Sequence, residues 1–67
     1  MNLDVQQFAE ALNKMLRRDM NNLADDLASN QCKSLEDYRF VCGRIQGLAN
    51  AEEHLKDLAH KLEMSDE

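Results

Sequence analysis

The sequence contains no proline and no tryptophan, and its aromatic residues are limited to Phe8, Tyr38 and Phe40. β-sheets are enriched in aromatic and β-branched residues, which are scarce here. Leucine, alanine, glutamate, aspartate, lysine, asparagine and glutamine dominate instead. This composition is typical of long helices and predicts an all-α protein.

Long apolar runs are also missing. None approaches the roughly 20 residues that span a bilayer, so we expect no membrane partner. The N-terminal segment has neither the basic region nor the apolar stretch of a secretory signal. We therefore expect Cys32 and Cys42 to be free thiols in a reducing cytoplasm. Two cysteines cannot form a disulfide scaffold, so a chain of 67 residues depends on helix packing and on partners.

Positive charge is in deficit, and the formal net charge is −5. Residues 1–33 contain four basic and five acidic residues, whereas residues 34–67 contain four basic and eight acidic residues. A nucleic-acid binder needs a basic surface that follows the phosphates. We therefore expect no direct contact with DNA or RNA.

Apolar periodicity predicts a first helix over residues 3–29, with Asn2 as its N-cap, Asp4 in its first turn and Asn30 closing its C-terminus. Gln6, Asn13 and Arg17 are expected on the side opposite the apolar stripe. The stripe that should face the core is about 140° wide. It consists of Val5, Phe8, Ala9, Leu12, Met15, Leu16, Met20, Leu23 and Leu27.

A second helix is predicted over residues 34–63, where Ser34 and the acids that follow it resemble a capping box. The connection, residues 30–33, is short, and a short connection between two long helices makes them antiparallel. The predicted fold over residues 1–67 is a single domain, an antiparallel two-helix hairpin that self-association or a larger partner completes.

The second helix has more apolar surface than one neighbouring helix can cover. Its main stripe is Tyr38, Val41, Cys42, Ile45, Leu48, Ala49, Leu55 and Ala59. A second apolar set lies beside this stripe. It consists of Phe40, Gly43, Gly47, Ala51, Leu58 and Leu62. Because a hairpin buries only one stripe, we expect this second set to bind a partner.

Gly43 and Gly47 are the only glycines in the chain, and both lie inside a predicted helix. Each destabilises a helix by roughly 0.5–1 kcal/mol relative to alanine. Glycines at this spacing, extended by Ala51, would allow another helix to come close. The alternative is that they only make room for the first helix of the same hairpin.

No residue set predicts catalysis, a cofactor or a metal. Cys32 and Cys42 lack the spacing of a zinc motif, and His54 and His60 lie on different faces of the helix. A two-helix hairpin also offers no enclosed pocket. Asp19 and Glu52 each interrupt an apolar stripe, and we expect them at the rim of the hairpin, near basic groups such as Arg44 or Lys14, or fixing the register of the helices.

One segment, Ser34–Leu48, resembles small helical proteins encoded by tailed bacteriophages, many of them near head and tail genes. The residues that carry the resemblance are Tyr38, Arg39, Gly43, Ile45, Gly47, Leu48 and Ala51. The resemblance covers about a quarter of the chain. It implies a phage origin and a role in the virion, and it implies no catalytic residues.

We therefore predict a non-enzymatic protein–protein interaction component, a minor structural or accessory protein of a phage virion that docks by helix packing. Its partner would be a larger virion protein, another copy in a four-helix bundle of coiled-coil type, or both. It would reside in the virion, and in the host cytoplasm before assembly. The alternative is a small acidic phage regulator that binds and inhibits a host protein.

Overall fold

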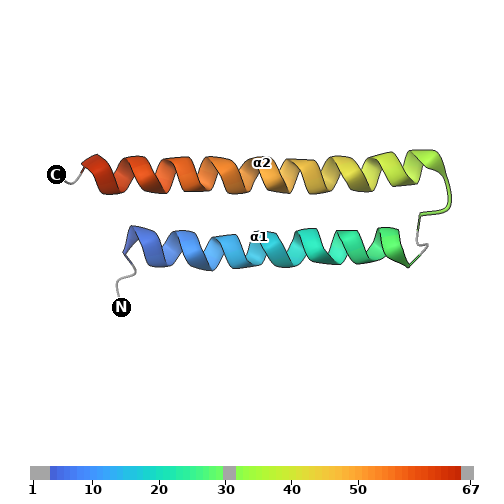
Figure 1. Cartoon of the computed structure of the whole chain (residues 1–67), viewed down its shortest axis with the longest axis horizontal. Helices are drawn as coiled ribbons and strands as arrows, with labels where there is room; N and C mark the ends of the chain where they lie inside the picture. Colours follow the sequence, from blue (N-terminus) through green and yellow to red (C-terminus); the bar gives the residue numbers. More distant parts are fainter. Residues whose placement is uncertain (1–3, 30–31, 66–67) are drawn as a thin grey trace.

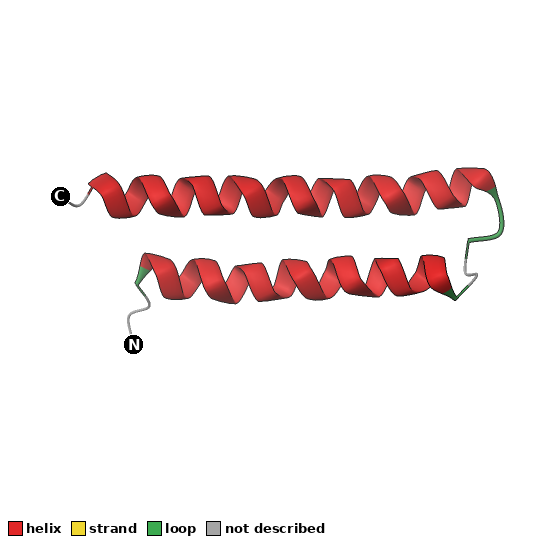
Figure 2. Cartoon of the chain, viewed as in Figure 1, coloured by secondary structure: helices red, strands yellow, loops and turns green. Residues whose placement is uncertain are grey.

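The computed structural model describes residues 4–29 and 32–65, and these form two α-helices, α1 (Val5–Ala28) and α2 (Leu35–Ser65). The helices lie side by side and run antiparallel (Figure 1). They pack against each other along their length, and the described residues contain no strand (Figure 2). The predicted all-α hairpin is confirmed.

The start of α1 differs from the prediction. Asp4 is the N-cap: its Oδ1 accepts a hydrogen bond from the backbone N–H of Gln7 at 2.7 Å, and its own N–H donates to Gln7 Oε1 at 3.2 Å. This reciprocal pair is a capping box and fixes the first turn. The predicted caps, Asn2 and Asn30, lie outside the described residues, and α1 closes with the Ser29 N–H donating to the Asp25 carbonyl at 2.9 Å.

The start of α2 agrees with the prediction. Ser34 Oγ accepts a hydrogen bond from the Asp37 N–H at 3.1 Å, so Ser34 satisfies one of the free donors of the first turn. The Asp37 carboxylate accepts from the backbone N–H of Lys33 at 3.3 Å, one residue before the expected position. The side chains of Ser34 and Asp37 therefore fix the backbone where the connection enters α2.

The core is a thin seam between the helices, and Met20 and Leu23 are its most buried apolar residues among those described. Most residues of the two predicted stripes are at least partly buried in it. Three are not: Phe8, Met15 and Tyr38 each expose half of their surface or more. These three side chains lie at the margins of their stripes, and a single neighbouring helix does not reach them.

The hairpin measures 51 × 21 × 13 Å. Its shortest dimension is close to the diameter of one helix, about 10–12 Å, so the molecule is a single layer of two helices. Both broad sides of this layer face outward. Within the described residues, no helix is long and apolar enough to cross a lipid bilayer.

Candidate protein-interaction surface

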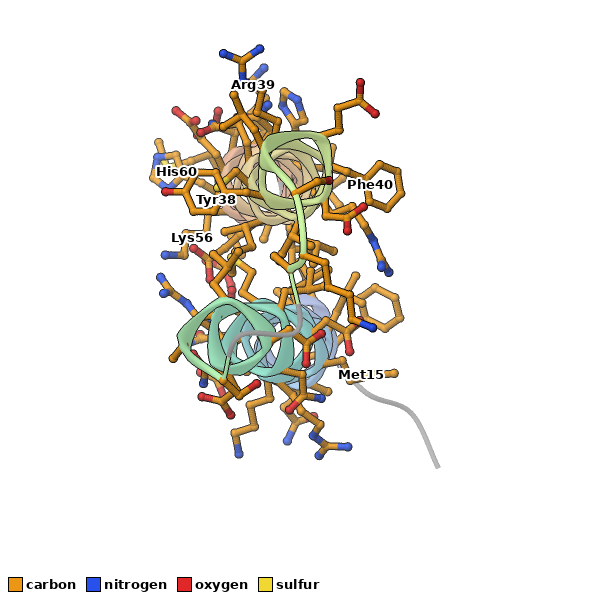
Figure 3. All side chains as sticks on the ribbon, turned by 90° about the vertical axis from the view of Figure 1, so that its right-hand side faces the viewer. Met15, Tyr38, Arg39, Phe40, Lys56 and His60 are labelled. Carbon is orange, nitrogen blue, oxygen red and sulfur yellow. The ribbon has the colours of Figure 1, made fainter. Side chains whose placement is uncertain are left out.

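The two broad sides of the hairpin differ in chemistry. Seen along the length of the molecule, Met15 and Phe40 point to one side, whereas Tyr38, Lys56 and His60 point to the other (Figure 3). Residues separated by whole helical turns share a side, which places Phe8 with Met15, and Leu58 with Phe40. We call the first side the apolar face. It consists of Phe8 and Met15 of α1 and of Phe40, Gly43, Gly47, Ala51, Leu58 and Leu62 of α2.

All six residues predicted to bind a partner are exposed. Phe40 and Leu58 expose more than half of their surface, and so do Phe8 and Met15, which α1 adds to the same face. The sequence pattern assigned Phe8 and Met15 to the core, and that assignment is wrong. Their spacing of seven residues, at one margin of the stripe, is the signal that could have identified them.

The glycines do not serve the packing of α1 against α2. A Cβ atom added at Gly43 or at Gly47 would have no neighbouring atom within 4 Å. The alternative interpretation, that these glycines make room for the first helix of the same hairpin, is therefore wrong. Their backbone is open: Gly47 lies on the apolar face, and Gly43 lies at the outer edge of that face, toward Arg39.

An open groove of about 560 Å³ crosses the apolar face toward the connecting loop. Asp19, Asn22 and Asp26 of α1 line one wall, and Arg44 and Gly47 of α2 line the other. The Arg44 guanidinium carbon lies 5.9 Å from the centre of the Phe40 ring, within the range of a cation–π interaction. The loop end of the face is thus acidic on α1 and basic on α2.

The opposite side, which we call the polar face, carries an ion pair between the helices. Glu52 is buried, with 7% of its surface exposed, and its two carboxylate oxygens accept hydrogen bonds from Arg17 Nε at 2.6 Å and Nη2 at 2.8 Å. Lys56 Nζ lies 3.8 Å from the same carboxylate. The basic partner of Glu52 is therefore Arg17, not Arg44 or Lys14. Glu52 lies inside the seam rather than at its rim.

Two residues of α1 that the pattern placed opposite the core contribute to this polar face. Arg17 reaches Glu52, and Asn13 is half-buried with its Oδ1 atom shielded from solvent and without a hydrogen-bond partner. Gln6, Glu10, Lys56 and His60 line an open groove of about 280 Å³ beside them. The seam thus has an apolar margin on one face and a polar margin on the other.

The thiols lie near the loop end of the hairpin. Both cysteines are free and half-buried. Burial, with the nearby carboxylates of Asp37 and Asp26, raises the pKa of the Cys32 thiol. A hydrogen bond with the Cys42 side chain raises the pKa of Tyr38. Among the described residues, no three histidine, cysteine or acidic side chains gather as metal ligands would.

No protein family, curated protein or solved structure matches this chain.

Proposed function

We propose that this protein is a non-enzymatic interaction component that docks through its apolar face by helix packing. The observation that carries the proposal is the open backbone at Gly43 and Gly47 among large exposed apolar side chains. Two glycines that weaken a helix and contact nothing in the hairpin are explained by a helix that approaches from outside.

The surface is large enough for docking. The accessible area of the chain is 5617 Å², whereas a compact protein of this mass exposes roughly 4,300 Å². The difference, roughly 1,300 Å², is spread over the whole elongated chain, and it is larger than the ~800 Å² that each partner buries in a standard interface. Covering ~500 Å² of apolar area on this face contributes about 12 kcal/mol at 25 cal/mol per Å². With a matching contribution from the partner, this exceeds the estimated 4–15 kcal/mol lost on association.

The resemblance of Ser34–Leu48 to small phage proteins supports a role for this chain in a phage particle. We propose an accessory or minor structural protein of a virion, present in the host cytoplasm before assembly, whose partner is a larger virion protein, a second copy, or both. The acidic net charge and the mixed charges of both faces support a protein partner rather than nucleic acid. The grooves on both faces are open to water, which supports a role in binding rather than in catalysis.

Gly47→Leu tests this proposal because it fills the open backbone of the apolar face without touching the seam. We expect unchanged helicity by circular dichroism and loss of the protein from purified particles by quantitative mass spectrometry. His60→Leu, a similar increase in apolar surface on the polar face, is the control and should be retained. Normal incorporation of Gly47→Leu would contradict the proposal.

A second candidate is a small acidic regulator that binds and inhibits a host protein. The excess of acid in residues 34–67, eight acidic against four basic, favours it. Arg39, Arg44, Lys56 and Lys61 interrupt that charge, and a mimic of a phosphate backbone needs continuous acid. Expression early in infection, together with absence from purified virions, would support the regulator. Retention in virions at a fixed stoichiometry would support the structural component.

A further inference from the structure

We infer that the apolar face is covered by a second copy of this chain, in a two-fold dimer with both connecting loops at the same end. Each α2 then lies antiparallel across the α1 of the partner, and the four helices form a bundle. The inference rests on the proposed function, because it names the occupant of the docking face.

The apolar face exposes enough area for a dimer interface. Phe8, Met15, Phe40, Leu58 and Leu62 are all substantially exposed on this face. At roughly 100 Å² for each side chain, they offer about 500 Å² per copy. Two copies stacked face to face bury about 1,000 Å² from these side chains alone, which reaches the lower limit of a specific interface. The walls of the adjacent groove add to this area.

Charged and apolar residues are not spread evenly along the length of the apolar face. The Arg17–Glu52 hydrogen bonds fix the register of the two helices. Nine residues farther along α1, Asp26 therefore lies level with the turn of α2 that contains Gly43 and Arg44. Toward the open end, Phe8 lies level with the turn that contains Leu62, and Met15 lies level with the turn between Ala51 and Leu55, one turn before Leu58. Along the apolar face, α1 is thus charged toward the loop and apolar toward the open end, whereas α2 carries Phe40 and Arg44 toward the loop and Leu58 and Leu62 toward the open end.

This distribution selects one alignment of the two copies. With the loops together, Arg44 faces the acidic wall of the partner, Asp19 and Asp26, and the apolar ends cover each other. With one copy turned end for end about its middle, α1 would lie across the partner's α1 and α2 across its α2, so Arg44 would no longer face these carboxylates. Opposite charges therefore favour the first alignment. The open backbone at Gly47 lies beside the path of the partner's α1, so that helix can approach closely there.

The first experiment measures the oligomeric state by sedimentation equilibrium. We expect the wild-type chain to dimerise and Met15→Glu to be monomeric, because it places a charge in the apolar contact. His60→Glu, the same new side chain on the polar face, should dimerise like the wild type. A wild-type chain that is monomeric at several hundred micromolar would overturn the inference, and so would a dimer that Met15→Glu leaves intact.

The second experiment tests the alignment by charge reversal. Arg44→Asp and Asp26→Arg should each weaken the dimer roughly tenfold or more, because each places like charges across the interface. Mixed in equal amounts, the two variants should form a heterodimer of near wild-type affinity, detected by native mass spectrometry. Both pairs that join position 44 of one copy to position 26 of the other are then opposite in charge, while the same pairs within each hairpin stay like-charged. Restoration therefore reports contacts between copies.

Arg39→Asp is the matched control, since Arg39 points away from α1 and from both faces (Figure 3). It should dimerise normally and should not form a preferred heterodimer with Asp26→Arg. Failure of the mixture to restore affinity would overturn the proposed alignment. A monomeric chain that is still incorporated into particles would overturn the dimer and leave the proposed function standing. A chain that dimerises but is absent from particles would overturn the proposed function and leave the dimer standing.

Discussion

Arg17 and Glu52 form one ion pair, yet removing one or the other should have unequal effects on stability. The Glu52 side chain is 9% exposed, whereas the Arg17 side chain is 58% exposed. Arg17→Met leaves a buried carboxylate whose nearest cation is Lys56 at 3.8 Å. Glu52→Leu leaves a guanidinium that water can solvate. The first change strands a charge in the seam, and the second does not.

The magnitudes follow from this asymmetry. Stranding one member of a buried pair costs 3–5 kcal/mol, and solvent near Arg17 reduces this to about 2–3 kcal/mol for Arg17→Met. In a chain of this size, that loss lowers the melting temperature by roughly 10–20 °C. Glu52→Leu loses two hydrogen bonds but buries a leucine worth about 1.5–3 kcal/mol. We expect it to be as stable as the wild type or up to ~2 kcal/mol more stable.

Thermal and urea unfolding followed by circular dichroism, at one low protein concentration, measures both effects. The double variant completes the cycle and should match Glu52→Leu, since Arg17 has no buried charge left to compensate. Lys56→Met is the control for general loss of positive charge and should cost less than ~1 kcal/mol, because Lys56 is well exposed. If Glu52→Leu destabilised the hairpin more than Arg17→Met, the reasoning from burial would be refuted.

Three further predictions concern other parts of the hairpin. Gly47→Ala should raise the free energy of unfolding of the isolated hairpin by about 0.5–1 kcal/mol, because its Cβ meets no atom within 4 Å; an unchanged or lower stability in urea would count against the open backbone. Asp4→Ala removes the capping box of α1 and should cost about 1 kcal/mol, whereas Asp4→Asn should retain most of the stability in the same melts. The raised pKa of Cys32 keeps its thiol protonated to higher pH, so it should react with iodoacetamide more slowly in the folded chain than in urea at pH 8. The Cys42→Ser variant leaves Cys32 as the only thiol. Equal reaction rates for its folded and urea-unfolded forms would contradict this last prediction.

The hairpin itself was predictable from the sequence, because its determinants are local. The apolar spacing defines two helices, and Ser34 followed by acids marks where the second begins. The start of α1 was within reach as well, since Asp4 with glutamine three residues later matches a capping box. Asn2 and Asp4 are comparable N-caps by residue type, and only the reciprocal pairing with Gln7 separates them.

The side chains at the margins of the seam were not predictable in the same way. Phe8, Met15, Asn13 and Arg17 lie on either side of the α1 stripe, and their burial depends on how α2 is rotated and placed against it. Glu52 interrupts the apolar stripe of α2 and was expected at the rim, but it is buried in the seam, and its partner depends on the register between two distant segments. A single sequence gives the periodicity of each helix and leaves that register open.

The core of the hairpin is incomplete, and this affects its folding. Among the described residues, no side chain is completely buried, and Met20 and Leu23 are the most enclosed apolar ones. A layer one helix thick has no interior of its own, so any surface that covers the apolar face also supplies the missing half of the core. Folding and docking then become linked equilibria, and the free energy of unfolding rises with the concentration of the covering surface. Copies that find no covering surface would unfold transiently more often, and proteases would cleave them first. The amount of intact protein would then follow the number of docking positions.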